Sequence, residues 1–321
     1  MKLVTFQDHD DDHDRLGGLL DEDVLIDLSA ANRSAQFASM LALIEGGESA
    51  WGEARSLLTH PPKQHLRNLR DLRLRAPLPL PPQYRDAMTF HKHIRQAFGA
   101  ARLERARASG DAAEIAAAEQ ARQAPVPEVH RKIPVYYKGN RYSVADPGED
   151  IPWPAYSNVM DFELELACVI GKGGKDIPRE RALDHVFGFT ILNDFSARDA
   201  QREEMAGMLG PAKGKDFDKG NAFGPCLVTL DEIGDPHALR MIARVNGEVW
   251  CDDSSATMHW RFEDVIARVS MGETLHPGEI IGSGTVGDGC GAEHLRYLRA
   301  GDVVELEVEK IGVLRNRVVR A

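Results

Sequence analysis

Residues 161–170 read DFELELACVI, an alternation of acidic and apolar side chains that turns into a continuous apolar run. Alternation predicts a β-strand, because side chains two residues apart in a strand point to the same face. Glu163 and Glu165 are therefore expected to project together, while the apolar residues between them pack on the other face. The apolar continuation predicts that this strand enters a protein core.

A third acidic residue, Asp194, follows the apolar run 187–192, which is typical of a buried strand. If the two strands lie side by side, three carboxylates form an all-oxygen pocket, which suits Mg²⁺, Mn²⁺ or Ca²⁺ better than zinc. Like charges side by side are unfavourable unless a cation compensates them. The plain alternatives are a solvent-exposed strand face for Glu163 and Glu165, and a turn cap for Asp194.

Basic and amide side chains lie near these acids in the sequence. Arg198 and Gln201 follow Asp194 within two helical turns, a spacing that suits a pocket wall holding substrate oxygens. A local Asp194–Arg198 ion pair is the simpler alternative. Lys215 lies in the segment GPAKGKDFD (210–218), where it either belongs to a solvated loop or steadies a carboxylate or a developing enolate.

The segment GSGTVG (282–287) places a hydroxyl among glycines. Glycine lets the backbone approach closely, so N–H groups here can reach a ligand carboxylate, although a tight β-turn explains the pattern equally well. The run DHDDDHD (8–14) is expected to be an acidic loop rather than a metal site.

The proline-rich stretch PLPLPP (77–82) predicts a boundary between an N-terminal α+β domain, residues 1–80, and a larger domain, residues 81–321. After residue 134, short apolar runs alternate with Gly and Pro turns, which indicates a β-rich sandwich, roll or barrel. The stretch 66–74 is compatible with a strand or a frayed helix.

Helical spacing is expected over Tyr84–Ala108, and Asp111 is expected to cap a second helix that runs to about Gln123. This alanine-rich stretch, around residues 84–130, is predicted to be a helical insertion. It is either a lid over the site or a surface hairpin with no catalytic duty, because periodicity does not separate the two.

Composition limits the classes of function. A net charge of −11 over 321 residues argues against nucleic acid as a partner, but a local basic pocket still allows a small acidic substrate. The four cysteines form no C-x-x-C pair, which argues against a structural zinc site and a disulfide framework. No run reaches about 18 apolar residues, so no membrane span is expected. A cytoplasmic location is predicted.

Taken together, these segments resemble the fumarylacetoacetate hydrolase family, and its fumarylacetoacetase-like members in particular. The resemblance covers residues 84–320 and is carried by motifs in a fixed order: DFELEL, NDFSARDAQ, GPAKGKDFD, Gly224-Pro225, GSGT and LRAGDVVELEVEKIGVLRN (298–316). It implies an α+β, β-rich fold with a mixed β-roll core and a smaller N-terminal domain. It also implies a homodimer that binds Mg²⁺, Mn²⁺ or Ca²⁺.

The resemblance also implies roles for individual residues. The implied metal carboxylates are Glu163, Glu165, Asp194 and Asp86. The implied catalytic groups are the base His93, with Lys215 and Arg198. The implied substrate-binding residues are Gln201, Gly284, Thr285, Tyr137 and Arg102. Smaller members use an H-x-x-E pair, but Gln96 stands at that offset from His93, so the partner of this histidine is left open.

These roles lead to the hypothesis of a divalent-metal-dependent hydrolase that cleaves a carbon–carbon bond in a small 1,3-dicarbonyl acid. Examples are an acylpyruvate or a fumarylacetoacetate-like compound from aromatic or amino-acid catabolism. His93 is expected to take a proton from water, and Lys215 to help stabilise the enolate that leaves. One alternative is a metal-dependent decarboxylase, hydratase or isomerase of a 2-oxo acid on the same fold. The other is a metal-binding scaffold without turnover.

Overall fold

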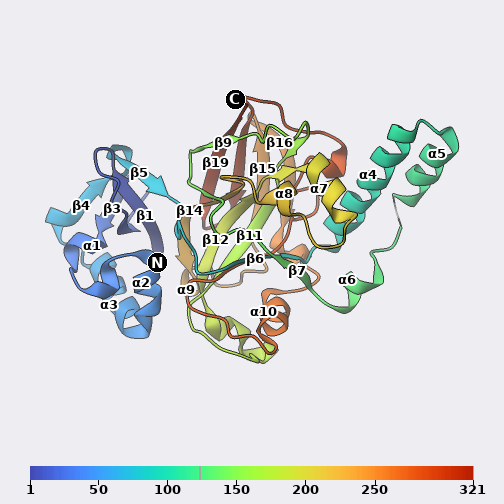
Figure 1. The fold of residues 1–321 in the computed structure, drawn as a ribbon. Helices are drawn as coiled ribbons and strands as arrows, with labels where there is room; N and C mark the ends of the chain where they lie inside the picture. The colour runs from blue at the N-terminus through green and yellow to red at the C-terminus, as the bar shows by residue number, and fades with distance from the viewer. Residues whose placement is uncertain (123, 321) are drawn as a thin grey trace.

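A large mixed sheet runs through the centre of the computed structural model, which describes residues 1–122 and 124–320 (Figure 1). Its main path has the strand order β4-β3-β2-β1-β14-β12-β11-β17-β6-β7, with β5 paired to β1 and β8 paired to β14. The strands are β1 (Lys2–Asp8), β2 (Arg15–Leu19), β3 (Val24–Asp27), β4 (Leu66–Asn68), β5 (Leu72–Arg75), β6 (Tyr84–Met88), β7 (Val135–Lys138), β8 (Val144–Ala145), β11 (Leu164–Ile170), β12 (Val186–Asp194), β14 (Asn221–Thr229) and β17 (Ile280–Gly282).

A second sheet has the order β16-β15-β18-β19-β9. Its strands are β9 (Asp150–Pro152), β15 (Arg240–Val245), β16 (Glu248–Ser254), β18 (Val303–Val308) and β19 (Gly312–Val319). Buried residues of both sheets, such as Ile191, Met241 and Leu306, belong to one hydrophobic core. A small third sheet pairs β10 (Met160–Asp161) with β13 (Ser196–Ala197). The predicted α+β, β-rich class is confirmed.

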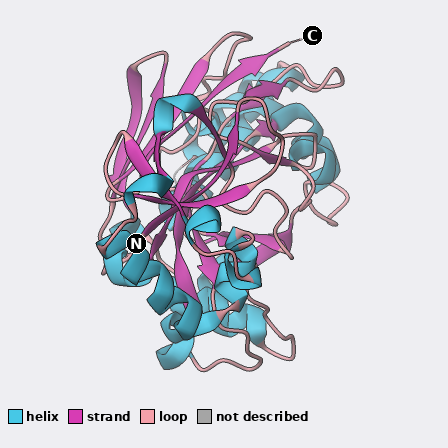
Figure 2. Ribbon diagram, turned by 90° about the vertical axis from the view of Figure 1, so that its left-hand side faces the viewer, coloured by secondary structure: helices cyan, strands magenta, loops and turns pink. Residues whose placement is uncertain are grey.

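Helices surround the strands, which cross at the centre of the molecule (Figure 2). They are α1 (Leu28–Ala31), α2 (Met40–Glu45), α3 (Gly47–Thr59), α4 (His91–Ser109), α5 (Ala112–Ala121), α6 (Glu128–Lys132), α7 (Arg198–Met205), α8 (Ala212–Lys215), α9 (Leu230–Ile233) and α10 (Phe262–Ser270). Short 3₁₀ helices cover Ala35–Phe37, Lys63–His65, Leu69–Asp71, Arg179–His185, Ser255–Thr257 and Ala292–His294. None of the described helices is long and apolar enough to cross a membrane.

The N-terminal segment is joined to the rest of the molecule by the large sheet. Strand β1 pairs with β14, with Leu3 opposite Leu227, and the side chains of both residues belong to a second buried core. The sheet therefore continues across the boundary expected near residue 80, and the division into residues 1–80 and 81–321 stays a prediction. The DHDDDHD run lies at the turn after β1, where residues 9–13 are exposed, as expected of an acidic loop.

The expected helix Tyr84–Ala108 is wrong in its first part. Tyr84–Met88 is strand β6, which pairs in parallel with β17 and antiparallel with β7, and α4 begins only at His91. Both Tyr84 and Arg85 are buried. Pairing and burial on both sides of the sheet override the local helical spacing, because a buried backbone needs ladder partners.

The expected continuous strand 161–170 is also wrong at its start. Asp161 belongs to β10 and pairs with Ser196, whereas β11 begins at Leu164. Glu163, between them, forms an isolated bridge with Cys290. The carboxylate of Asp161 accepts hydrogen bonds from the N–H groups of Gly291 and Ala292. These bonds hold Asp161 in the small third sheet rather than in the large one. The chain thus passes from the small sheet to the large sheet between Asp161 and Leu164.

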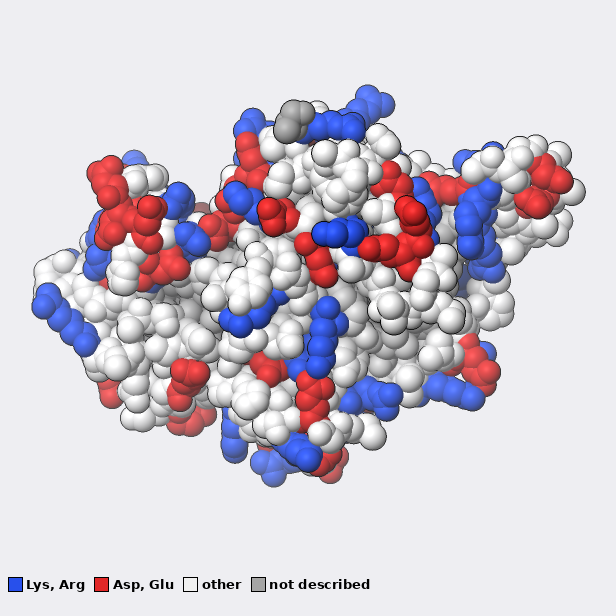
Figure 3. Space-filling model, viewed as in Figure 1, with Lys and Arg blue, Asp and Glu red and all other residues white. Residues whose placement is uncertain are grey.

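Helices α4 and α5 form a hairpin that projects from the body of the molecule (Figure 1). Its own core is small and consists of Leu103, Ala106 and Ala118, with Ile115 and Leu295 partly buried against it. Glu104 ties the hairpin to the body, because it accepts hydrogen bonds from Tyr297 and Arg202. Figure 3 shows basic side chains along this projection and both signs of charge over the rest of the face. The helical insertion is confirmed, and its role as a lid stays a prediction.

Candidate active site

Three buried carboxylates converge at the ends of neighbouring strands. Asp86 lies on β6, Glu165 on β11 and Asp194 at the end of β12, and one oxygen from each lies within 4.8 Å of the others. The N–H of Gly284 donates to Asp86 Oδ1 at 3.1 Å and to Glu165 Oε2 at 3.0 Å. The large sheet, rather than a flexible loop, positions this group, which we call the carboxylate trio.

Gly282 on β17 makes room for the trio. A Cβ atom at this position would lie 2.5 Å from Asp86 Oδ1 and 2.9 Å from Glu165 Oε2, so a side chain here would displace the two carboxylates. Glycine leaves the space that they occupy. The sequence singled out the GSGTVG segment for approach to a substrate, and in the structure its first glycine borders the trio.

The electrostatics of the trio disfavour the simultaneous ionisation of all three carboxylates. Burial raises the pKa of Asp86 to about 6 and that of Asp194 to about 7, and burial together with Asp86 raises the pKa of Glu165 well above its usual range. Among the described residues, Glu165 Oε1 and Asp194 Oδ1 are buried without a hydrogen-bond partner. Unsatisfied buried oxygens are costly, and a hard divalent cation satisfies such oxygens well. The trio therefore fits Mg²⁺, Mn²⁺ or Ca²⁺.

Glu163 lies next to the trio but has different partners. Its Oε2 accepts from Lys215 Nζ at 2.6 Å, and its Oε1 pairs with Arg198 Nη2 at 2.8 Å. Although burial opposes ionisation, these two cations hold the pKa of Glu163 below its usual range. Lys215 also donates to Asp194 Oδ2 at 2.7 Å, so its ammonium group links Glu163 to the trio. A metal-ligating role for Glu163 stays a prediction.

Arg198 is held in place at the first residue of α7. Its Nε donates to Asp161 Oδ2 at 2.8 Å, and its Nη1 donates to Gln201 Oε1 at 2.9 Å. Arg198 and Gln201 thus lie side by side, as the sequence predicted. Within the described residues no Arg198–Asp194 ion pair is found, because the guanidinium pairs with Asp161 and Glu163 instead. Sequence reasoning did not assign Asp161, the anchor of this arginine.

His93 meets a carboxylate far away in the sequence. It lies in the first turn of α4, is buried, and its Nδ1 lies 3.2 Å from Glu293 Oε1, 200 residues further along. Glu293 is fixed by the N–H groups of Asp288 and Cys290. Gln96, at the H-x-x-E offset from His93, donates instead to Asp288 Oδ1 at 2.6 Å. Glu293 therefore supplies the partner that the sequence left open.

The remaining predicted substrate residues lie in different surroundings. Tyr137 donates its hydroxyl to Asp194 Oδ2 at 2.9 Å, so it contacts the trio directly. Gly284, in the left-handed region with φ of 76°, provides the shared N–H, and Thr285 next to it is buried. Arg102 bonds Phe98 O of its own helix at 3.3 Å. Substrate binding by these residues stays a prediction.

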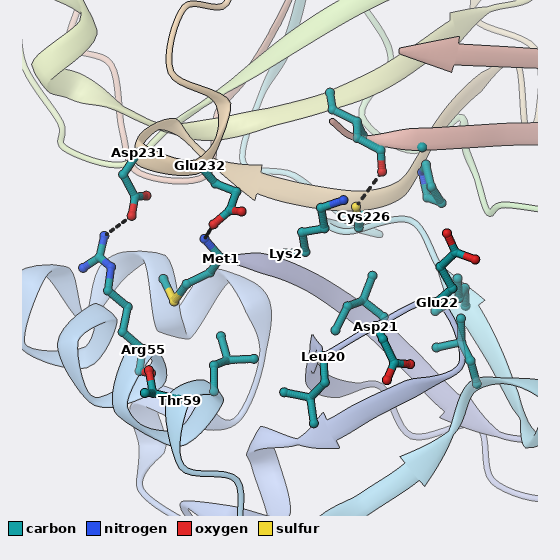
Figure 4. A pocket seen from close by; sticks show the side chains of 17 residues that line it. Met1, Lys2, Leu20, Asp21, Glu22, Arg55, Thr59, Cys226, Asp231 and Glu232 are labelled. Atoms are coloured by element: carbon teal, nitrogen blue, oxygen red, sulfur yellow. Dashed lines mark hydrogen bonds and ion pairs between the residues drawn. The ribbon is translucent and has the colours of Figure 1, made fainter. Parts of the chain in front are cut away.

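A hollow of about 760 Å³ lies elsewhere, between the N-terminal segment and the end of β14 (Figure 4). The amino group of Met1 borders it and bonds Thr229 Oγ1 at 2.5 Å and Glu232 Oε2 at 3.2 Å. Arg55 and Asp231 form an ion pair across its rim. None of the predicted site residues lines this hollow.

Residues 105–319 match the family pattern described as fumarylacetoacetate (FAA) hydrolase C-terminal. This range includes Glu293, Glu165 and Asp194. The chain belongs to the fumarylacetoacetate hydrolase family. The family resemblance inferred from the ordered motifs is thereby confirmed.

Relatives and solved structures resemble the chain over nearly its whole length. A Xenopus laevis protein named oxaloacetate tautomerase fahd2, mitochondrial, is 35% identical over 322 residues, covering 99% of this chain and 90% of its own. A Bacillus subtilis protein named oxaloacetate tautomerase YisK is 30% identical, covering 94% and 95%. The fumarylacetoacetate hydrolase structure from Exiguobacterium antarcticum matches with a TM-score of 0.76 at 28% identity and covers all of both chains.

Proposed function

We propose that this enzyme interconverts the keto and enol forms of a small 2-oxo diacid, with oxaloacetate as the first compound to test. The observation that carries this proposal is the similarity over nearly the whole chain to two relatives named oxaloacetate tautomerases. This favours the isomerase alternative over carbon–carbon bond hydrolysis, which was the main hypothesis from the sequence.

Asp86, Glu165 and Asp194 are the residues that would hold the divalent cation. When bound, such a cation supplies Lewis-acid charge that stabilises negative charge on a substrate oxygen. Mg²⁺ is the first choice, with Mn²⁺ or Ca²⁺ as alternatives, because all the offered ligands are carboxylate oxygens.

Tautomerisation moves a proton between the carbon next to the ketone and the ketone oxygen, so it needs a group that accepts and returns a proton. His93 suits this task because Glu293 binds its Nδ1. When Nδ1 carries the proton, Nε2 is left as the acceptor, and the ring orientation is held by a carboxylate that two backbone N–H groups fix.

The buried cations have separate duties in this proposal. Lys215 lies between Glu163 and Asp194, where its positive charge offsets the negative charge that develops when the substrate loses a proton. Arg198 and Gln201, bonded to each other, orient a substrate carboxylate. Asp161 keeps the guanidinium in place, so orientation does not depend on a mobile side chain.

The test follows the ultraviolet absorbance of enol-oxaloacetate in the presence of Mg²⁺. The protein is expected to accelerate decay of the enol band in proportion to its concentration, above the rate with Mg²⁺ alone and without forming pyruvate. Glu165→Gln serves as the matched control, because it removes one trio carboxylate at nearly constant volume. Pyruvate release would instead indicate decarboxylation.

Hydrolysis is the second candidate, because the His93–Glu293 pair is equally suited to take a proton from water. It is tested on the same preparation with acetopyruvate and fumarylpyruvate. Formation of two acids from either compound, without acceleration of oxaloacetate tautomerisation, would favour hydrolysis over the proposal.

A further inference from the structure

A second cluster of potential metal ligands lies beside the carboxylate trio, and it consists of His93, Cys290 and Glu293. One ligand atom from each residue lies within 4.8 Å of the others, and all three side chains are buried. We propose that this cluster is a second metal site, selective for Zn²⁺ or Co²⁺ over Mg²⁺, and that its occupation blocks the enzyme. The binding claim goes beyond the proposed function, and only the block rests on it.

The donor atoms of this cluster differ in kind from those of the trio. Imidazole nitrogen, thiolate sulfur and carboxylate oxygen form a mixed set that suits Zn²⁺, whereas Mg²⁺ and Ca²⁺ prefer oxygen alone. Three protein ligands leave one position of a tetrahedral zinc ion for water or another small ligand. One site therefore favours hard cations and its neighbour favours softer ones.

The backbone holds this cluster nearly in place before any metal arrives. Glu293 accepts the N–H groups of Asp288 at 3.1 Å and Cys290 at 3.0 Å, and it bonds His93 at 3.2 Å. Cys290 is fixed by its bridge to Glu163. Little side-chain freedom is lost when a metal binds, which lowers the cost of binding.

The thiol of Cys290 is available to a metal. Cys226 and Cys251 direct their Sγ atoms to the carbonyls of Ile311 and Gly287, at 3.3 Å and 3.6 Å. The described residues contain no corresponding hydrogen bond of Cys290, whose Sγ lies within 4.8 Å of a ligand atom of His93 and of Glu293. On binding, the S–H bond breaks, its proton goes to solvent and the sulfur donates the electron pair to the metal.

Occupation of this site has a direct consequence for catalysis. Zinc bound to His93 and Glu293 takes both members of the pair that handles the proton. The enzyme is then expected to lose turnover while the carboxylate trio still holds its own cation. Such inhibition is not relieved by excess Mg²⁺, because the two ions do not share ligands.

The binding experiment uses protein saturated with Mg²⁺ and titrated with Co²⁺. A thiolate-to-cobalt charge-transfer band is expected in the near ultraviolet for the wild type and for Cys226→Ser, the control for a different buried thiol. The band is expected to vanish in Cys290→Ser. The affinity of this variant for Zn²⁺ is expected to fall by at least about tenfold, because losing even an outer-shell partner lowers metal affinity by about 10–100-fold. A band that persists in Cys290→Ser, or no band at all, overturns the proposal.

A second measurement does not depend on any variant folding. X-ray absorption at the zinc edge of the Mg²⁺-saturated wild type is expected to show a sulfur neighbour at about 2.3 Å. Oxygen and nitrogen neighbours alone overturn the proposal. The inhibition experiment compares the wild type with Cys290→Ser in excess Mg²⁺. Equal inhibition of both proteins by Zn²⁺ would mean that Zn²⁺ displaces Mg²⁺ from the trio, and it would overturn the proposed block. Absence of any tautomerase activity would contradict the proposed function but would leave the binding results intact.

Discussion

Glu163 and Glu165 are two residues apart and both buried, yet the structure gives them opposite electrostatic surroundings. Glu163 meets two cations, Lys215 and Arg198, and its pKa lies below the usual range. Glu165 meets Asp86 and Asp194, and its pKa lies well above it. The difference shows that identical side chains in one motif serve two purposes. Cations of the protein neutralise Glu163, whereas Glu165 has no such partner among the described residues, and its charged form is therefore disfavoured.

The largest expected effect on metal binding and turnover is that of Glu165→Gln, which removes one carboxylate of the trio. Divalent metal affinity is expected to fall by at least about 10–100-fold, and turnover with it, since even outer-shell partners are worth that much. The metal-free protein is expected to be as stable as the wild type or more stable, because repulsion within the trio falls. Calorimetric titration with Mg²⁺ and thermal melting in chelator check both. Unchanged affinity would show that Glu165 is not a ligand.

Glu163→Gln is expected to act in the opposite way on the metal-free protein. Lys215 and Arg198 lose their shared carboxylate, and breaking a buried ion pair costs about 3–5 kcal/mol. Because the pKa of Glu163 is lowered, its contribution is fully present above the usual glutamate pKa and is lost as pH falls through the lowered value. Denaturant unfolding at a series of pH values should show the deficit of the variant shrinking in acid. Equal stability at neutral pH would contradict this account.

Metal removal gives a smaller effect and tests the same contrast. A cation at about 100 times its dissociation constant stabilises the folded state by about 2.7 kcal/mol. The wild type is therefore expected to lose about that much stability when Mg²⁺ is chelated, whereas Glu165→Gln, with its weaker affinity, is expected to lose only about 0.4–1.4 kcal/mol. Chemical unfolding with and without chelator measures the difference. A wild type that is indifferent to chelator would contradict the interpretation of the trio as a cation site.

The contrast also shows how far the sequence leads. The motif DFELEL and the apolar run before Asp194 predicted buried carboxylates that meet, because strand periodicity and burial are local properties. Asp86 was implied by the family resemblance alone, and the local spacing around it predicted a helix where β6 lies between two strands. Long-range pairing decided that stretch, and a local pattern contains no information about its partner.

The partners of Glu163 and His93 illustrate the same limit. The sequence offered Gln96 at the local offset from His93, whereas the structure supplies Glu293 from a short 3₁₀ helix 200 residues away. The available signal was an acidic residue a few positions after the glycine-rich GSGTVG segment, but nothing local links it to α4. Likewise, Asp161 was expected to belong to the same strand as Glu165, but it lies in the small third sheet, where it binds Arg198.

The smallest expected effect comes from Glu293→Gln. Turnover is expected to fall by about 10–100-fold, because the change weakens the orientation of a base worth roughly 10²–10⁴-fold without removing it. Mg²⁺ affinity should stay the same, since Glu293 has no contact with the trio among the described residues. Gln96→Ala is the matched control, because Gln96 bonds Asp288 rather than His93 and should leave turnover nearly unchanged. If the two variants exchanged these outcomes, the residue at the local H-x-x-E offset would be the partner that matters, and Glu293 would be a purely structural carboxylate.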